Sequence, residues 1–299
     1  MNIMSEITNK KFPLRLILSV CELSSAAWYK KPDTKIPLQK RGPKPKTDDS
    51  TILNAIKNEI KESRFHSEGY KKICARINYK GIIVDKNRVY EIMKKNNLLT
   101  SQRPKRNGSS RKHDGTIKTN EPNKMWGTDG KQFYTQQEGR CWMFSVIDHF
   151  NDEILGHFIC KKGDRFAALE PIKKAVKMRF GNLTKDICKN IDLTLRADHG
   201  TQYDSNDFQK EIKFLGFKYS PAFVRSPECN GIIERFHRTL QEQIFDINQF
   251  ENLEEANIVI SEFIDKYNDE WILHRLGLKS PKDYREEYEK KSKIIQKSA

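Results

Sequence analysis

The chain has 299 residues with a formal net charge of +15, and 36% of its residues are hydrophobic. This length is sufficient for two domains, and the absence of any run near the ~20 apolar residues that cross a bilayer argues against a membrane protein. The six Cys form no C-x-x-C pair, which argues against a zinc site and favours reduced thiols in the cytoplasm.

The positive charge is concentrated before residue 125. Residues 1–124 hold 28 Lys and Arg against 12 Asp and Glu, whereas residues 125–299 hold 27 against 28. A basic module joined to a nearly neutral one favours a nucleic-acid partner over a merely soluble basic surface.

The first hundred residues predict helices. Apolar positions between residues 10 and 30 predict one or two short helices that pack inward, within an N-terminal helical segment and linker at 1–47. Residues 48–99 predict three helices, which suit a helix-turn-helix-like DNA-binding module. A helical bundle with a solvated charged face explains this segment equally well. On the last helix, the residues expected to contact DNA are Lys86, Arg88, Lys94 and Lys95.

Residues 100–124 predict a basic linker. They hold seven Lys and Arg and two acids, with almost no apolar residue. The linker either follows a phosphate backbone or only tethers two domains. In the first case we expect DNA contacts from Arg103, Lys105 and Arg106.

From residue 125 the hydrophobic period changes to two, which predicts strands. Three consecutive strands are followed by alternating helices and short strands. This order predicts an α/β fold class, with an RNase H-like mixed sheet in a core at 125–246 and a helical segment at 247–299. In that topology the first and fourth strands can lie side by side. The expected strands are 125–134, 141–148, 153–160, 193–197 and 217–220, and the expected helices of the core are 166–180, 205–215 and 230–245.

Three acidic residues indicate the chemistry. Asp129 lies in the first strand, Asp198 ends the fourth, and Glu234 follows on a helix after a gap of 35 residues. Carboxylates that hold two hard cations ~3.5–4 Å apart can activate a water or a 3′-hydroxyl and stabilise a departing oxygen. Among 40 acidic residues the spacing alone is weak evidence, but the flanking Asp-x-Gly-x-Gln-Tyr and Asn-Gly-x-x-Glu-Arg-Phe motifs strengthen it. Asp148 and Asp152 are expected to be turn acids.

The helix that carries Glu234 has two expected faces. Arg238 and Gln241 share the face of Glu234 and are expected to contact DNA. The expected buried stripe comprises Ile233, Phe236, Leu240 and Ile244.

Four parts of the chain together resemble the OrfB product of bacterial two-frame insertion sequences, a family with a retroviral-integrase-like DDE core. They are Leu18–Leu23 with Trp28 and Tyr29, Glu68–Ile73 with Val89–Lys94, the segments around the three acids, and Tyr267–Glu270 with Leu273–Leu278. Two departures are Gln241, where the family usually has a basic residue, and Glu68, where it often has an aromatic one.

The resemblance implies a DNA transposase that cleaves 3′ ends and transfers strands. It implies two Mg²⁺ ions on Asp129, Asp198 and Glu234, for which Mn²⁺ can substitute. The implied partners are double-stranded DNA of the element ends and target, further copies of the chain, and an upstream-frame product, in the bacterial cytoplasm at the nucleoid. A non-catalytic DNA-binding regulator and an RNase H-type nuclease are the alternatives. The intact triad disfavours the first, and the basic residues 1–124 disfavour the second.

Overall fold

The computed structural model describes residues 4, 6, 9–29, 47–100, 119–221 and 231–298. The chain divides into two compact units, residues 1–46 and 47–299. In the first unit the two short helices are confirmed as α1 (Leu14–Val20) and α2 (Ser25–Tyr29). The expectation that Trp28 and Tyr29 pack inward is wrong, because they are 42% and 70% exposed.

The second unit begins with a three-helix module, which confirms the three expected helices. They are α3 (Asp49–Glu62), α4 (Tyr70–Tyr79) and α5 (Lys86–Lys95). Asp48 and Asp85 begin α3 and α5 by accepting the backbone N–H of the residue two positions on. The module has its own apolar core, which contains Ile52, Ile56, Ile73, Ile77, Val89 and Met93.

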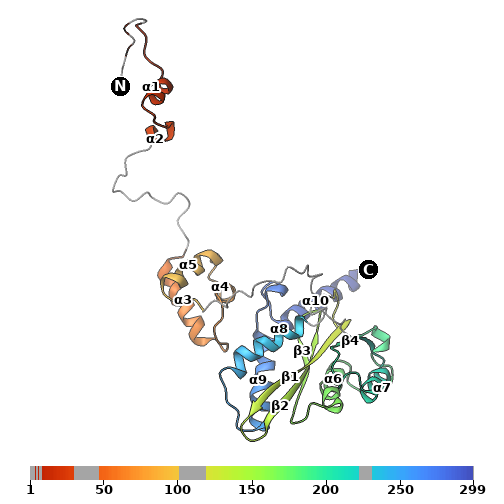
Figure 1. The fold of residues 1–299 in the computed structure, drawn as a ribbon. Coiled ribbons are helices and arrows are strands. Elements are labelled where there is room, and N and C mark those ends of the chain that lie inside the picture. The colour runs from red at the N-terminus through yellow and green to blue at the C-terminus, as the bar shows by residue number, and fades with distance from the viewer. Residues whose placement is uncertain are drawn as a thin grey trace. The chain divides into compact units, whose positions relative to one another are not determined.

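The core expected at residues 125–246 is built on a five-stranded mixed sheet, as predicted. The strand order is β3-β2-β1-β4-β5, with β1, β2 and β3 antiparallel and both β4 and β5 parallel to β1 (Figure 1). The expected adjacency of the first and fourth strands is therefore confirmed. The strands are β1 (Met125–Thr135), β2 (Gly139–Asp148), β3 (Ile154–Cys160), β4 (Thr194–Ala197) and β5 (Lys218–Pro221).

Helices cover both faces of the sheet (Figure 1). One apolar cluster joins α6 (Arg165–Phe180) and α7 (Asn206–Leu215) to the sheet, and another joins α8 (Gly231–Leu240) and α9 (Leu253–Glu270) to the opposite face. Gly156 on β3 allows α6 to approach, because a Cβ there would lie 2.3 Å from the carbonyl oxygen of Pro171. The remaining elements are η1 (Lys189–Ile191), the π-helical turn η3 (Gln241–Phe245), η4 (His274–Leu276) and α10 (Pro281–Ser298). Of the helices in the described ranges, none is long and apolar enough to cross a membrane.

The helical module packs on the C-terminal segment. Arg76 of α4 donates to Glu68 through Nε and Nη2, at 2.9 and 3.1 Å, and also donates to the backbone oxygen of Glu270 at 3.1 Å. The His66 N–H donates to Gln243 Oε1 at 2.8 Å. Glu68, which departs from the family's aromatic residue, is therefore the buried carboxylate that holds Arg76 against the C-terminal segment.

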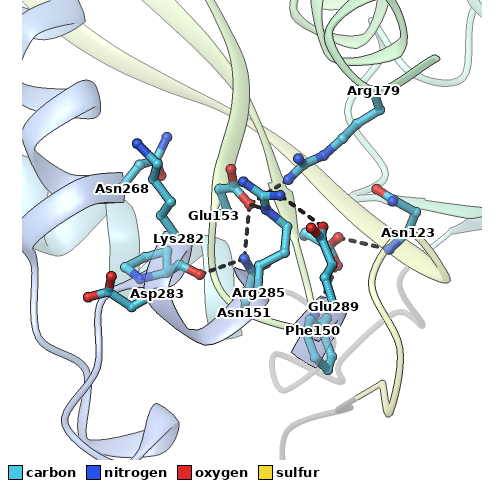
Figure 2. Close-up of polar contacts among 12 residues, drawn as sticks. Asn123, Phe150, Asn151, Glu153, Arg179, Asn268, Lys282, Asp283, Arg285 and Glu289 are labelled. Carbon is cyan, nitrogen blue, oxygen red and sulfur yellow. Dashed lines mark hydrogen bonds and ion pairs between the residues drawn. The ribbon is translucent and has the colours of Figure 1, made fainter. Parts of the chain in front are cut away.

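A polar network fixes α10 to the β2–β3 turn. Glu153 is buried and accepts hydrogen bonds from Arg179 and Arg285 (Figure 2). Beside it, Asp148 accepts the backbone N–H groups of Asn123 and Phe150, both at 2.9 Å. Burial raises the pKa of Asp148 to about 6, against the lowering effect of these hydrogen bonds. Asp148 accordingly stabilises the end of its strand, as expected for a turn acid.

Candidate active site

The register of β1 and β4 brings Asp129 and Asp198 side by side. Gly127 pairs with Arg196 across the parallel strands; two residues later, Asp129 lies within β1 and Asp198 lies just beyond the end of β4. Asp129 Oδ1 accepts the N–H of Gly130 at 2.8 Å, and Asp198 Oδ1 accepts the N–H of Gly200 at 3.0 Å. One oxygen of each carboxylate is thus held by a local backbone donor.

Glu234 joins this pair from α8. Burial raises the pKa of Glu234, and the negative charge of Asp129 raises it further, whereas Arg238 and His237 lower it. Burial likewise raises the pKa of Asp198, and the charge of Asp129 is the next cause. The negative charge of Asp129 therefore raises the pKa of both Asp198 and Glu234. Such mutual raising is typical of carboxylates that lie close together in one site.

The rotation of α8 agrees with the sequence pattern. The expected stripe is buried, and Glu234 and Arg238 are exposed. Gln241 is half-buried and donates to Asp246 Oδ1 at 2.6 Å, so its amide is already engaged within the turn that follows α8. The same helix therefore separates an apolar face that packs on the sheet from a polar face beside the carboxylates.

Sequence reasoning missed His237, which contacts Asp129. His237 is 7% exposed, and its Nδ1 lies 3.3 Å from Asp129 Oδ2. Its Nε2 lies 3.0 Å from Ser145 Oγ, and Ser145 is the cross-strand partner of Asp129. The available signal was the Glu-x-x-His spacing, because residues three apart are neighbours on a helix surface.

Sequence reasoning also did not identify Lys131, whose pKa is affected by the charge of Asp129. It follows Asp129 by two residues and so lies on the same face of β1. Its Nζ is 5.8 Å from the ring centroid of Phe245. Burial lowers the pKa of Lys131, while the charges of Asp246 and Asp129 raise it. A cation therefore stands beside the carboxylates on the strand itself.

The carboxylates fit a hard cation by their chemistry. In the part of the chain that the structure describes, no three His, Cys, Asp or Glu side chains lie close enough together to hold a metal ion as they stand. Neither Asp198 nor Glu234 forms an ion pair with a described Lys or Arg, although the nearby charge of Arg238 lowers the pKa of Glu234. Mg²⁺ prefers oxygen ligands and retains several waters, so it needs few protein ligands.

The basic residues expected to contact DNA differ in their surroundings. Lys86, Lys94 and Lys95 are exposed on α5. Arg88 instead donates to Asp49 Oδ1 from Nε at 2.8 Å and to the backbone oxygen of Thr47 at 2.6 Å. The expected linker contacts Arg103, Lys105 and Arg106 lie outside the described residues.

Comparisons with known proteins agree with this architecture. Residues 119–227 match a family model described as an integrase core domain, and residues 215–281 match a second model with the same description. The chain is similar to the transposase InsD of insertion element IS2 from Escherichia coli, with 29% identity over 245 residues that cover 80% of this chain and 79% of the relative. The InsD copy of element IS2D from strain K12 gives the same values.

Two solved structures of viral integrases are also similar. One is the simian T-cell lymphotropic virus intasome in complex with the PP2A regulatory subunit B56 gamma, with a TM-score of 0.47 and 17% identity, covering 71% of this chain and 70% of that one. The other is the HTLV-2 integrase catalytic core domain in complex with magnesium, with a TM-score of 0.41 and 17% identity, covering 56% and 98%. The two family matches thus place an integrase core domain in residues 119–281, and the InsD relatives make the chain similar to insertion-element transposases.

Proposed function

We propose that Asp129, Asp198 and Glu234 form the catalytic centre of a transposase that cleaves the 3′ ends of an insertion element and joins them to target DNA. The observation that carries this proposal is the register of β1 and β4, together with the effect of Asp129 on the pKa values of both other carboxylates. The three side chains would hold two Mg²⁺ ions, and Mn²⁺ can replace them.

The bound cations would supply Lewis-acid stabilisation of the leaving oxygen and activation of the attacking oxygen. In cleavage, a water attacks the phosphorus at the element end, and the departing oxygen becomes the 3′-hydroxyl. In joining, that hydroxyl attacks a target phosphodiester, and a target 3′ oxygen departs. The protein's residues bind and orient the phosphates in both steps, so no covalent enzyme intermediate is required.

DNA is bound by basic residues outside the carboxylate centre in this proposal. On the three-helix module these are Lys86, Arg88, Lys94 and Lys95, and near the centre Arg238 is a further basic contact. The neutral amide of Gln241 joins it once that amide releases Asp246. Arg103, Lys105 and Arg106 extend the surface along the linker. The exposure of all three α5 lysines supports this arrangement, whereas Arg88 would have to leave Asp49 to reach a phosphate.

The proposal includes an assembly and a domain division. The chain acts as a homo-multimer on paired DNA ends at the bacterial nucleoid, with the product of an upstream frame as a further partner. Its parts are an N-terminal segment at 1–47, a helix-turn-helix-like module at 48–99, a linker at 100–124, the core at 125–246 and a C-terminal segment at 247–299.

A labelled duplex with an inverted-repeat end of the element tests the proposal. With Mg²⁺, the wild-type chain should nick the 3′ end and give strand-transfer products. Asp198→Asn should bind the duplex and give neither product. Asp192→Asn is the matched control, because Asp192 is exposed and pairs with Lys218 away from the centre. Wild-type activity in Asp198→Asn, or cleavage only of an RNA–DNA hybrid without joining, would contradict the proposal.

A further inference from the structure

His237 connects the helix that carries Glu234 to the strand that carries Asp129. Its imidazole lies between two groups that face each other across β1 and β2: Asp129 Oδ2 at 3.3 Å from Nδ1 and Ser145 Oγ at 3.0 Å from Nε2. Ser145 is fully buried, and its hydroxyl has no other hydrogen-bond partner among the described residues. The ring therefore joins three elements directly beneath the carboxylate centre.

The chemistry of the three groups selects one arrangement of hydrogens. An ionised carboxylate only accepts hydrogen bonds, so an attractive contact requires that Nδ1 carry the hydrogen. In the neutral imidazole Nε2 is then an acceptor, and the Ser145 hydroxyl can donate to it. The hydroxyl thereby fixes the tautomer that directs Nδ1–H toward Asp129.

Both oxygens of Asp129 are then oriented by the protein. Oδ1 accepts the N–H of Gly130 at 2.8 Å, and Oδ2 faces the Nδ1 of His237. Because His237 follows Glu234 by three residues, the contact that orients Asp129 also holds α8 at the height where Glu234 faces the same centre. Hydrogen-bond partners of this kind fix the orientation of metal-binding carboxylates.

We propose that His237 is a positioning residue that, oriented by Ser145, sets the Asp129 carboxylate and the α8 helix in the geometry that binds the cations; the inference rests on the proposed function of the three carboxylates. A packing role alone does not explain the site. An apolar side chain would fill the same space between β1, β2 and α8, whereas here both ring nitrogens face polar groups in a buried position.

Metal binding by the full chain, measured calorimetrically without DNA, tests the inference independently of activity. We expect His237→Leu to weaken Mn²⁺ binding by about 10- to 100-fold, the range typical for loss of such a partner. His237→Asn retains a donor close to the position of Nδ1 and should restore most of the affinity. Ser145→Ala leaves the ring but removes the group that fixes its tautomer, and should give an intermediate loss.

Ile233→Val is the matched control for stability. Ile233 is fully buried on the same helix, and its substitution weakens packing without removing a polar contact. Its Mn²⁺ affinity should equal that of the wild type even where its melting temperature falls as far as that of His237→Leu. Wild-type Mn²⁺ affinity in His237→Leu, or equal losses in His237→Leu and His237→Asn, would overturn the positioning role. A wild-type chain that neither binds Mn²⁺ nor cleaves DNA would overturn the proposed function and this inference with it.

Discussion

Leu240 is fully buried against the sheet, whereas Arg238, two residues earlier and on the opposite side of the same helix, is exposed beside Glu234. Arg238 is close enough to lower the pKa of Glu234 through its positive charge. The two faces of α8 therefore differ: one packs in the core and the other is exposed beside Glu234. Stability depends on the face of Leu240, and in the proposed function the face of Arg238 contacts substrate phosphate.

Substitutions on the two faces should therefore have opposite effects. Leu240→Ala should reduce the free energy of unfolding by about 2–5 kcal/mol, because it leaves a cavity in the core. Arg238→Ala should leave the free energy of unfolding within about 0.5 kcal/mol of the wild type and weaken DNA binding or strand transfer. Chemical denaturation and an end-duplex binding assay measure the two effects. Unfolding of Arg238→Ala with normal stability of Leu240→Ala would mean that Glu234 does not face the centre.

Asp148 makes stability depend on pH. Its pKa is about 6 in the folded chain, above the ordinary value of 3.8, because the carboxyl is buried. Between about pH 4 and 6 the folded state keeps a proton that the unfolded state releases, so this group lowers stability as pH rises, by at most about 3 kcal/mol. The wild-type free energy of unfolding minus that of Asp148→Asn should fall over this interval. A difference that is constant with pH would show that Asp148 is not protonated in the fold.

The ion pair between Arg76 and the buried Glu68 should contribute strongly to stability. The Glu68 side chain is 1% exposed, so Arg76→Ala would leave a buried carboxylate without its cation. We expect a loss of about 3–5 kcal/mol in the free energy of unfolding. Arg64→Ala is the control, because Arg64 pairs with Glu270 at the surface, where such pairs contribute at most about 1 kcal/mol. Equal losses in the two variants would contradict a special contribution of the buried ion pair to stability.

The exposed lysines of α5 should determine part of the salt dependence of DNA binding. Each phosphate contact that is lost should reduce the slope of log K against log salt by about 0.9. Lys94→Gln combined with Lys95→Gln should therefore reduce the magnitude of the slope by about 2. Lys290→Gln, at an exposed position on α10, should leave the slope unchanged. An unchanged slope in the double variant would remove α5 from the DNA surface.

The local spacing of apolar residues was sufficient to predict the helices and strands of the core and the face of α8 that is buried. The adjacency of β1 and β4 also followed, because alternating helices and strands leave few ways to arrange the sheet. The contacts of polar side chains with partners far away in the sequence could not be predicted. Arg88 pairs with Asp49, and His237 meets Ser145 from 92 positions away, so neither contact has a signature in any local window.

In the proposed function, strand cleavage and joining depend on cations held by the three carboxylates. A change of ligand softness at Asp198 tests it most directly, because a thiolate is a poor ligand for hard Mg²⁺ and a better one for the softer Mn²⁺. Cleavage of the labelled end duplex by Asp198→Cys should fall at least about 100-fold in Mg²⁺ and recover in part in Mn²⁺, while Asp192→Asn stays active in both. Wild-type activity of Asp198→Cys in Mg²⁺ would contradict the account.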